Sequence, residues 1–482
     1  MAAGTSGALL GGTTLGVLAS GVALGAVLGG LAAIQPRWAV VAMVVAVGVT
    51  AFVYTRLMGK NLGLLVLLIV TCLIDRHTFP LSRVSLRPEQ IAALIALAVF
   101  AVERVRSGRA LALELNLAEI ALGAWFLVGF VSSVLLAPSR SQSIKILALL
   151  VVSSLALALP RRLSDENPAE IQEAVRWLLL ALATESAYTL FTYFLRVFGP
   201  IISLSINPAG GHLNAYGTLW EPNVLGAVCG AGAVAWTYLG PRHFERAWIG
   251  IALCLGATVV SFTRFAWIAV AFVLVISLAP PLRRLIDLRT LRLGIAVALV
   301  MGLGVLAADR IGNYYPPAPA PTGAAVAPAP SSSRIFGVLG NSVDVLGRLY
   351  QFEAVFADLR GRPLQILLGG GVDSFGERHT NSGVPQHLAN LELTVFNDTG
   401  IVGLLVFGVF AFAIARAVWP RRTDPTVAGL GAMVLVIAIT NQSTETLELM
   451  ITWLLIGLLL AAGHAAGVSS STSARRGPGI AA

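Results

Sequence analysis

Residues 247–280 read AWIGIALCLGATVVSFTRFAWIAVAFVLVISLAP, an apolar run of 34 residues that contains one charged side chain, Arg264. A membrane-spanning helix needs about 20 apolar residues, so this run is too long for a single crossing. An arginine at membrane depth costs at least about 2.5–3.5 kcal/mol unless it faces protein, water or an anion. We therefore predict two short helices that meet at Arg264.

The composition of the whole chain agrees with a membrane location. Of the 482 residues, 56% are hydrophobic and 12% are charged, whereas soluble domains carry about 25% charged residues. The net charge of +9 comes from arginines between apolar runs, so we predict no nucleic-acid partner. The three cysteines lie in or beside apolar runs, which argues against disulfides and against a cysteine metal site.

Similar apolar runs recur along the chain and predict about fourteen membrane spans, some of them short or tilted. Their ranges are 9–34, 38–55, 62–74, 91–102, 115–136, 144–160, 177–199, 223–240, 247–262, 265–280, 293–308, 400–418, 426–441 and 448–464. The first run has no basic leader, so we interpret it as a retained span. The predicted fold class is all-α: a polytopic transmembrane helical bundle of about 12–14 spans with one large outer loop that contains short helices.

These runs divide the chain into four parts. Residues 1–308 are the N-terminal transmembrane helices, 309–399 a large extracytoplasmic loop, 400–464 the C-terminal transmembrane helices and 465–482 a cytoplasmic tail. The short arginine-rich segments occupy every second connection between spans, so they all lie on one side of the membrane. This places both termini in the cytoplasm and the large loop outside. The expected location is therefore the cytoplasmic membrane.

Several cations remain on the outer side, where the positive-inside bias does not explain them. They include Arg83, Arg87, His212 and Arg264. A membrane protein that gathers arginines and histidines on one side is suited to binding an anion. We therefore regard these residues as candidates for an anion site.

The large loop begins with a Pro/Ala linker at 314–333, which we expect to lack fixed structure. A helix is predicted over 346–360, where Leu349, Phe352, Phe356 and Leu359 form an apolar stripe between Arg348 and Arg360. Gly369–Gly371 is predicted as a turn, and Arg378 and His379 follow it. A second helix over 386–398 has a polar face directed at a wet cavity, made of His387, Asn390, Thr394 and Asn397.

The order of these motifs resembles that of the O-antigen ligase and O-antigen polymerase superfamily. The resemblance rests on Gly347-Arg348, the Gly369–Gly371 turn, and the polar helix that runs into Asp398-Thr-Gly-Ile-Val-Gly403. Upstream, Pro222-Asn223 looks like the family's Pro-Asn motif, and Ser261-Phe-Thr-Arg264 looks like its Ser-Arg motif.

The chain departs from the family pattern in two places. Ala389 precedes Asn390 where the family has a histidine, and Thr263 precedes Arg264 where the family has a serine. The nearest histidine to Asn390 is His387, and His379 is a second candidate for the catalytic base.

The resemblance implies a metal-independent membrane glycosyltransferase without a cofactor. Such an enzyme moves a glycan from a polyprenyl diphosphate carrier to a glycan or lipid acceptor on the outer face of the membrane. Arginine suits this chemistry because its planar fork of donors matches phosphate oxygens. We assign Arg264 and Arg348 to the departing diphosphate and His387 to the acceptor hydroxyl. The expected substrate-binding residues are Arg83, Arg87, His212, Asn223, Arg360, Arg378, His379 and Asn390, and none is expected to bind a metal.

Three other functions remain open. A ligase and a polymerase share one lipid-linked donor and differ in their acceptor, so these motifs do not separate them. A flippase or transporter of anionic lipid-linked glycans also needs arginines that face a cavity, but the chain lacks the internal repeats typical of transporters. A non-catalytic assembly subunit would use the loop as a docking surface and predicts an exposed apolar patch there.

Overall fold

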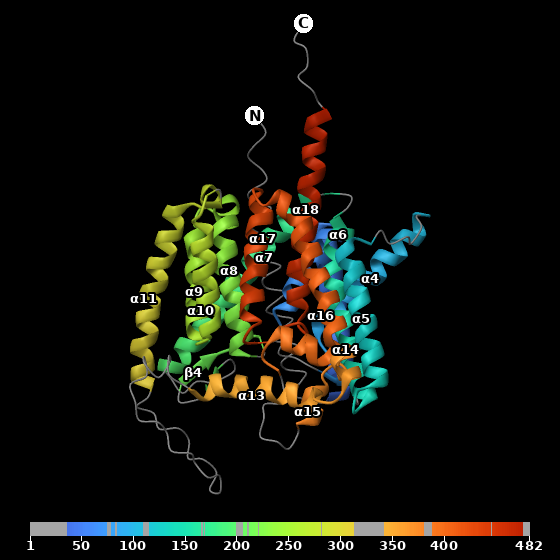
Figure 1. Ribbon diagram of the computed structural model, residues 1–482. Coiled ribbons are helices and arrows are strands. Elements are labelled where there is room, and N and C mark those ends of the chain that lie inside the picture. The colour runs from blue at the N-terminus through green and yellow to red at the C-terminus, as the bar shows by residue number, and fades with distance from the viewer. Residues whose placement is uncertain are drawn as a thin grey trace.

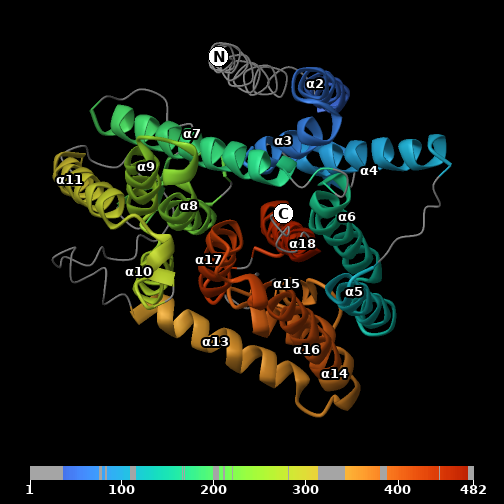
Figure 2. The same ribbon diagram turned by 90° about the horizontal axis from the view of Figure 1, so that it is seen from above.

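The computed structural model describes residues 36–74, 79–81, 84–108, 115–164, 167, 169–198, 206–209, 212–219, 221–280, 282–312, 342–379, 388–444 and 446–475. These residues form a helical bundle in which most of the long helices run roughly parallel or antiparallel to one another (Figure 1). Helices α4 and α7 are strongly inclined to the others (Figure 2). The long helices are α2 (Pro36–Met58), α3 (Lys60–Cys72), α4 (Pro88–Arg106), α5 (Leu117–Leu135), α6 (Arg140–Ser164), α7 (Ala169–Phe198), α8 (Pro222–His243), α9 (Ala247–Val260), α10 (Arg264–Ser277), α11 (Leu288–Gly312), α16 (Leu391–Val418), α17 (Pro425–Thr440) and α18 (Met450–Arg475).

The all-α class predicted from the apolar runs is confirmed. Each predicted span from 38–55 onward falls on one of these helices, and the first, 9–34, lies outside the described residues. Six of the described helices are long and apolar enough to cross a membrane, namely α5, α6, α7, α8, α16 and α18, and five shorter ones are also apolar. The predicted break at Arg264 is present, because α9 ends at Val260 and α10 begins at Arg264.

Short elements connect the long helices. Two are 3₁₀ turns, η1 (Leu282–Leu285) and η2 (Trp419–Arg421), and three are loop helices, α13 (Ser342–Leu359), α14 (Pro363–Leu368) and α15 (Ser374–Arg378). Two antiparallel hairpins, β1 (Phe79–Leu81) with β2 (Val84–Leu86) and β3 (Ile206–Ala209) with β4 (His212–Ala215), were not predicted.

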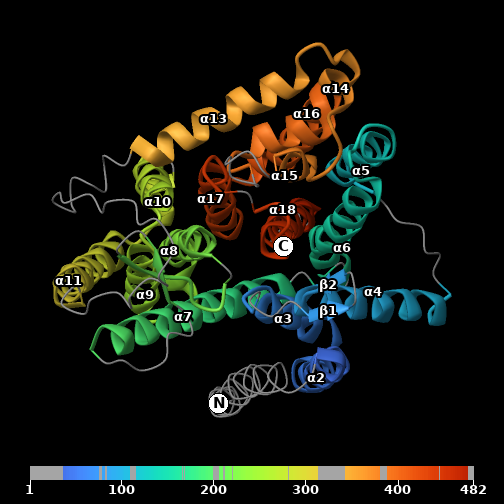
Figure 3. The same ribbon diagram turned by 90° about the horizontal axis from the view of Figure 1, so that it is seen from below.

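The bundle has two chemically different ends. The three loop helices lie at one end, which we call the loop end, and α13 crosses that end from α10 to α14 (Figures 2 and 3). At the opposite end lie η1, η2 and the C-terminal part of α18 (Figure 1). We call this the arginine end because η1 and η2 carry Arg283, Arg284, Arg421 and, directly after η2, Arg422.

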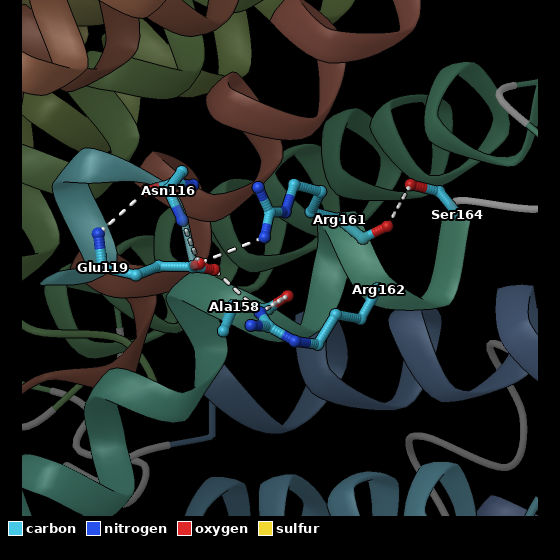
Figure 4. A network of polar contacts seen from close by, with 6 residues as sticks. All are labelled: Asn116, Glu119, Ala158, Arg161, Arg162 and Ser164. Carbon is cyan, nitrogen blue, oxygen red and sulfur yellow. Dashed lines mark hydrogen bonds and ion pairs between the residues drawn. The ribbon is translucent and has the colours of Figure 1, made fainter. Parts of the chain in front are cut away.

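A buried ion-pair network joins α5 to α6 at the arginine end (Figure 4). The carboxylate of Glu119 accepts hydrogen bonds from Arg162 at 2.7 Å and from Arg161 at 3.1 Å. The Glu119 side chain is 6% exposed, and it also closes a capping box with Asn116 at the start of α5. These two arginines therefore hold helices together as well as adding to the charge of this end.

Helix α8 and helix α18 lie inside the bundle, surrounded by the other helices (Figure 2). Glycines allow α8 to approach its neighbours closely: a Cβ atom at Gly226 would lie 2.6 Å from the Cβ of Thr263, and one at Gly230 would lie 2.8 Å from Val270. Small residues at helix contacts are typical of packing in membranes, where close van der Waals contact supplies much of the attraction.

Helices α11 and α18 extend past the ends of their predicted spans, and the second loop helix begins later than predicted. Helix α11 extends to Gly312, past the predicted domain boundary at 308, and α18 extends to Arg475, so part of the predicted tail 465–482 is helical. The second loop helix begins at Leu391 instead of 386, because Asn390 caps it by accepting a hydrogen bond from the backbone N–H of Leu393. The linker 314–333 lies outside the described residues.

The predicted apolar stripe of the first loop helix was also wrong in part. On α13 the buried apolar residues are Val355 and Leu359, whereas Phe352 and Phe356 are exposed. Val355 and Leu359 pack in a small core with Phe375, Leu388 and Leu393. This core fixes α13 on α15 and on the first turn of α16.

Candidate functional site

The loop end is built around a kink in α16. Gly400 has φ 65° and ψ −164°, values that interrupt the helix and that only glycine adopts readily. A side chain at Gly400 would collide with the backbone of Leu367, since its Cβ would lie 2.4 Å from the Leu367 carbonyl. The kink therefore lets α14 pack directly against the backbone of α16.

The predicted turn at Gly369–Gly371 is confirmed, and it docks into this kink. Gly369 and Gly371 have φ of 80° and 97°. A kink leaves helix carbonyls in need of other donors. Here the carbonyls of Asn397 and Asp398 accept from the N–H groups of Gly370 at 2.7 Å and Gly371 at 3.2 Å.

Side chains of α5 complete the same junction. The hydroxyl of Ser132 donates to the carbonyl of Asp398 at 2.9 Å, and that of Ser133 accepts from the N–H of Val372 at 3.2 Å. One carboxylate oxygen of Asp398 accepts from the backbone N–H of Asp373 at 3.1 Å. The turn is thus held by α5 and α16 together.

Arg378 joins α13, α15 and α16. Its Nη2 donates to Ser374 Oγ at 2.7 Å and to Asn397 Oδ1 at 2.9 Å, and its Nη1 lies 3.2 Å from Asp358 Oδ2. Burial lowers the pKa of Arg378, while the carboxylates of Asp358 and Asp398 oppose that change. Arginine stays protonated under such conditions, so Arg378 is a fixed buried cation.

His379 shares the carboxylate of Asp358. Its Nε2 lies 3.0 Å from Asp358 Oδ2, and its ring lies 4.5 Å from that of Phe375. A carboxylate hydrogen-bonded to a histidine sets the orientation and tautomer of the ring, as in hydrolase triads. This geometry makes His379 a stronger candidate for the base than the sequence alone indicated.

Asn223 and Arg264 come together at the start of α8 and α10. The hydroxyl of Thr263 donates to the carbonyl of Pro222 at 2.9 Å and lies 3.4 Å from Asn223 Oδ1, and Asn223 donates to Glu221 at 2.6 Å. Arg264 is the first residue of α10 and is half-buried. Among the residues that the structure describes, its guanidinium makes no ion pair or hydrogen bond.

Glu185, in the middle of α7, fixes the loop before α8. Its carboxylate accepts from the N–H of Thr218 at 2.8 Å and from the Thr218 hydroxyl at 2.7 Å. Gly217 has φ 57°, and a Cβ there would lie 2.0 Å from Glu185 Oε1. Glu185 therefore fixes Thr218, shortly before the start of α8, where Pro222 accepts the hydrogen bond from Thr263.

A small cavity lies at the kink, between α5, α6, α15, α16 and the segment that precedes α18. Its volume is about 30 Å³, and Asp373, Thr394, Asp398 and Glu448 are among its lining residues. That is room for a water molecule or two but not for a sugar. Arg87, the N-cap of α4, lies 3.9 Å from Glu448 at its rim. A glycan substrate would have to bind outside this cavity.

Two residues of the polar face predicted for the second loop helix lie inside the protein. Asn397 is fully buried and Thr394 is nearly so, and Asn397 is bonded to Arg378 and to Asp398 Oδ1. Asn390 lies before the helix and donates to Gln442 at 2.9 Å. These residues hold the loop in place.

The remaining candidates are distributed as follows. Arg360 follows α13 and is exposed. Arg348 lies in α13 and His212 in β4, but their side chains are outside what the structure describes, and Arg83 and His387 are outside the described residues altogether. The sequence analysis missed Asp358, Gln442 and Glu448 as partners, because each meets its cation or amide across elements distant in the chain and no local motif marks it.

No protein-family model matches the chain, and no curated protein matches it. Within the described ranges, no three histidine, cysteine, aspartate or glutamate side chains are grouped as metal ligands would be.

Proposed function

We propose that the protein is a membrane glycosyltransferase of the O-antigen ligase type. It would transfer a glycan from a polyprenyl diphosphate carrier to a glycan or lipid acceptor at the outer face of the cytoplasmic membrane. In this proposal the loop end faces outward and both termini lie in the cytoplasm. The reaction would use neither a metal nor a cofactor.

One observation carries the proposal: motif segments far apart in the sequence meet at the loop end. The Gly217–Asn223 segment, the Ser261–Arg264 turn, α13 and the Gly369–His379 segment all lie there (Figures 1 and 3). Arg264, half-buried at the start of α10, supplies a cation at this end.

The chemistry follows from these groups. The bond between the anomeric carbon and the diphosphate oxygen breaks, and a new bond forms between that carbon and the acceptor hydroxyl oxygen. Arg264 and Arg348 stabilise the negative charge that builds on the departing polyprenyl diphosphate. A histidine takes the proton of the acceptor hydroxyl.

Two histidines compete for the role of base. His387 is the candidate closest to the family motif. His379 is favoured by its hydrogen bond to Asp358, which holds the imidazole in one orientation. The proposal also includes the expected substrate-binding residues, which are Arg83, Arg87, His212, Asn223, Arg360, Arg378 and Asn390. Of these, Arg378, Asn223 and Asn390 are hydrogen-bonded to other side chains and would act by holding the site in shape.

The test is glycan transfer in vesicles that contain the purified protein and a polyprenyl-diphosphate-linked glycan. Wild type is compared with Arg264→Ala, Arg348→Ala, His387→Ala and His379→Ala. Arg106→Ala, an exposed arginine at the end of α4, is the matched control. Loss in both arginine variants and in one histidine variant supports the proposal and identifies the base.

The alternatives give different results in the same vesicles. Repeated addition of glycan units to the lipid carrier indicates a polymerase of the same superfamily. Movement of labelled lipid-linked glycan across the bilayer without any transfer overturns the enzyme proposal in favour of a flippase.

A further inference from the structure

A long apolar groove lies on the face of the bundle between α10 and α16, with α17 and α18 behind it. Its volume is about 980 Å³, at the upper limit of the roughly 300–1,000 Å³ typical of ligand pockets. Helix α13 crosses the loop end from α10, one wall of the groove, toward α14 (Figures 1 and 2). This groove is separate from the cluster around Arg378.

The groove follows α17 along its whole length. Its lining runs from Val427, beside the arginine end, to Asn441 and Gln442 just past the end of α17. Sixteen residues of helix span about 24 Å, which is most of the bilayer's hydrocarbon core of about 30 Å. Small residues make the groove deep, namely Ala411 and Ala415 of α16 and Ala428, Gly431, Ala432 and Ala438 of α17.

The two ends of the groove differ in charge. At the loop end its lining includes the carboxylate-bearing Glu392 beside Gln442. At the arginine end it is lined by Leu282 of η1 and by Trp419 and Arg422 at η2. Of the arginines, Arg422 lines the groove itself, and the same two turns also carry Arg283, Arg284 and Arg421.

The groups at the arginine end are arranged for an anion. The guanidinium of Arg422 lies over the ring of Trp419 at 4.8 Å and donates to the Trp419 carbonyl, yet Arg422 remains exposed. Asp424 and Asp287, the nearby carboxylates, accept hydrogen bonds from N–H groups at the starts of α17 and α11. Residues 282–290 and 419–425 together carry five arginines and two aspartates, so their net formal charge is positive.

We infer that the groove is a binding site for an anionic phospholipid. Its phosphate would bind Arg422 with Arg283 or Arg284, and its acyl chains would lie along α17 toward Phe407 and Phe410. The apolar lining matches the chains, and the cations match a phosphate. A membrane helix from another protein fits less well, because cytoplasmic helix ends carry cations that these arginines would repel.

This site is distinct from the proposed glycan chemistry at the loop end. A lipid held there would fill the space between α10 and α16 and support both helices from the arginine end. The inference therefore stands or falls independently of glycan transfer.

The test measures lipid retention. The protein is placed in vesicles of equal phosphatidylglycerol and phosphatidylcholine, re-extracted in mild detergent, and the lipid retained per chain is quantified by mass spectrometry. We expect wild type to retain phosphatidylglycerol over phosphatidylcholine by at least tenfold. Arg283→Glu with Arg422→Glu should abolish this preference.

A second variant tests the groove itself. Gly431→Trp fills it from α17, where a Cβ meets nothing closer than 4.0 Å, and should lower retained phosphatidylglycerol at least tenfold. Arg106→Glu, exposed at the end of α4, and Gly123→Trp, in open space on α5, are the matched controls and should retain it.

Three results would overturn the inference. Equal retention of the two lipids by wild type would mean that the arginines do not select an anionic head group. Unchanged retention in both the arginine and the Gly431→Trp variants would exclude the groove. Retention of a polyprenyl lipid that only Gly431→Trp displaces would assign the groove to the tail of the glycan donor.

Discussion

The carboxylate of Asp358, on α13, lies 3.0 Å from Nε2 of His379, at the end of α15. The same oxygen lies 3.2 Å from Nη1 of Arg378. One acid thus orients a histidine and neutralises a buried arginine, and it links the first loop helix to the segment that docks on the kinked helix. This relationship leads to the first of four predictions.

Asp358→Asn should reduce glycan transfer at least tenfold, because it replaces the charged acceptor that orients His379 by a neutral amide and removes the counter-charge of Arg378. Transfer in vesicles is the measurement, at matched amounts of inserted protein. Glu353→Gln, an exposed acid on the same helix, is the control and should be neutral. Full activity of Asp358→Asn would remove His379 from the candidates for the base.

Arg264→Ala should lower the rate of transfer by about 10²–10³, the cost of losing one donor to developing negative charge. Arg264→Lys should recover only part of the activity, because a lysine keeps the charge but not the planar fork of donors. The rate at saturating donor separates these variants from wild type. Equal activity of lysine and arginine at this position would mean that charge alone is needed.

Gly400→Ala should destabilise the protein by about 2–5 kcal/mol, since an alanine there combines positive φ with a collision against the Leu367 carbonyl. Thermal unfolding in detergent is the measurement. Gly408→Ala, in the same helix with no atom within 4 Å of the added Cβ, should be neutral or gain roughly 0.5–1 kcal/mol. Equal effects at the two sites would mean that the kink is not required.

Glu119→Gln should cost about 3–5 kcal/mol, because it leaves Arg161 and Arg162 as buried cations without their carboxylate. The loss should appear as a lower unfolding temperature without a specific effect on the loop end. Glu173→Gln removes a partly exposed ion pair with Arg176 within one helix and should change stability by less than about 0.5 kcal/mol. A similar small effect at Glu119 would contradict the assigned role of the network.

The positions of the long helices followed from the sequence because each is an apolar run of membrane length. The hairpins were missed for a physical reason: their strands are three or four residues long, and Pro80 and Pro208 lie within them, where proline usually argues against a strand. The start of α16 was misplaced although Asn390 is a good capping residue. The prediction placed the start at 386 because His387 continues the helical spacing of Asn390, Thr394 and Asn397.

The candidate site was predicted only in part. The sequence identified the turn at Gly369–Gly371 and the break before Arg264. Consecutive glycines and a single charge within an apolar run can both be recognised without knowledge of the tertiary structure. It could not assign Asp358 to His379, since the two residues come from different helices and their pairing depends on how α13 packs. It also treated Asn397 as solvated, whereas Arg378 reaches it in the interior.

The contact between the Gly369 turn and the Gly400 kink is made by main-chain atoms on both sides. A Cβ at Gly369 would lie 2.3 Å from the backbone of Asp398, and one at Gly400 would lie 2.6 Å from the nitrogen of Gly369. Because the atoms nearest each added Cβ belong to the backbone, replacing a neighbouring residue by a smaller one does not make room for a side chain at Gly369 or Gly400. In a genetic selection for function, a strain carrying Gly400→Ala should therefore recover by true reversion and not by second-site suppressors near this contact.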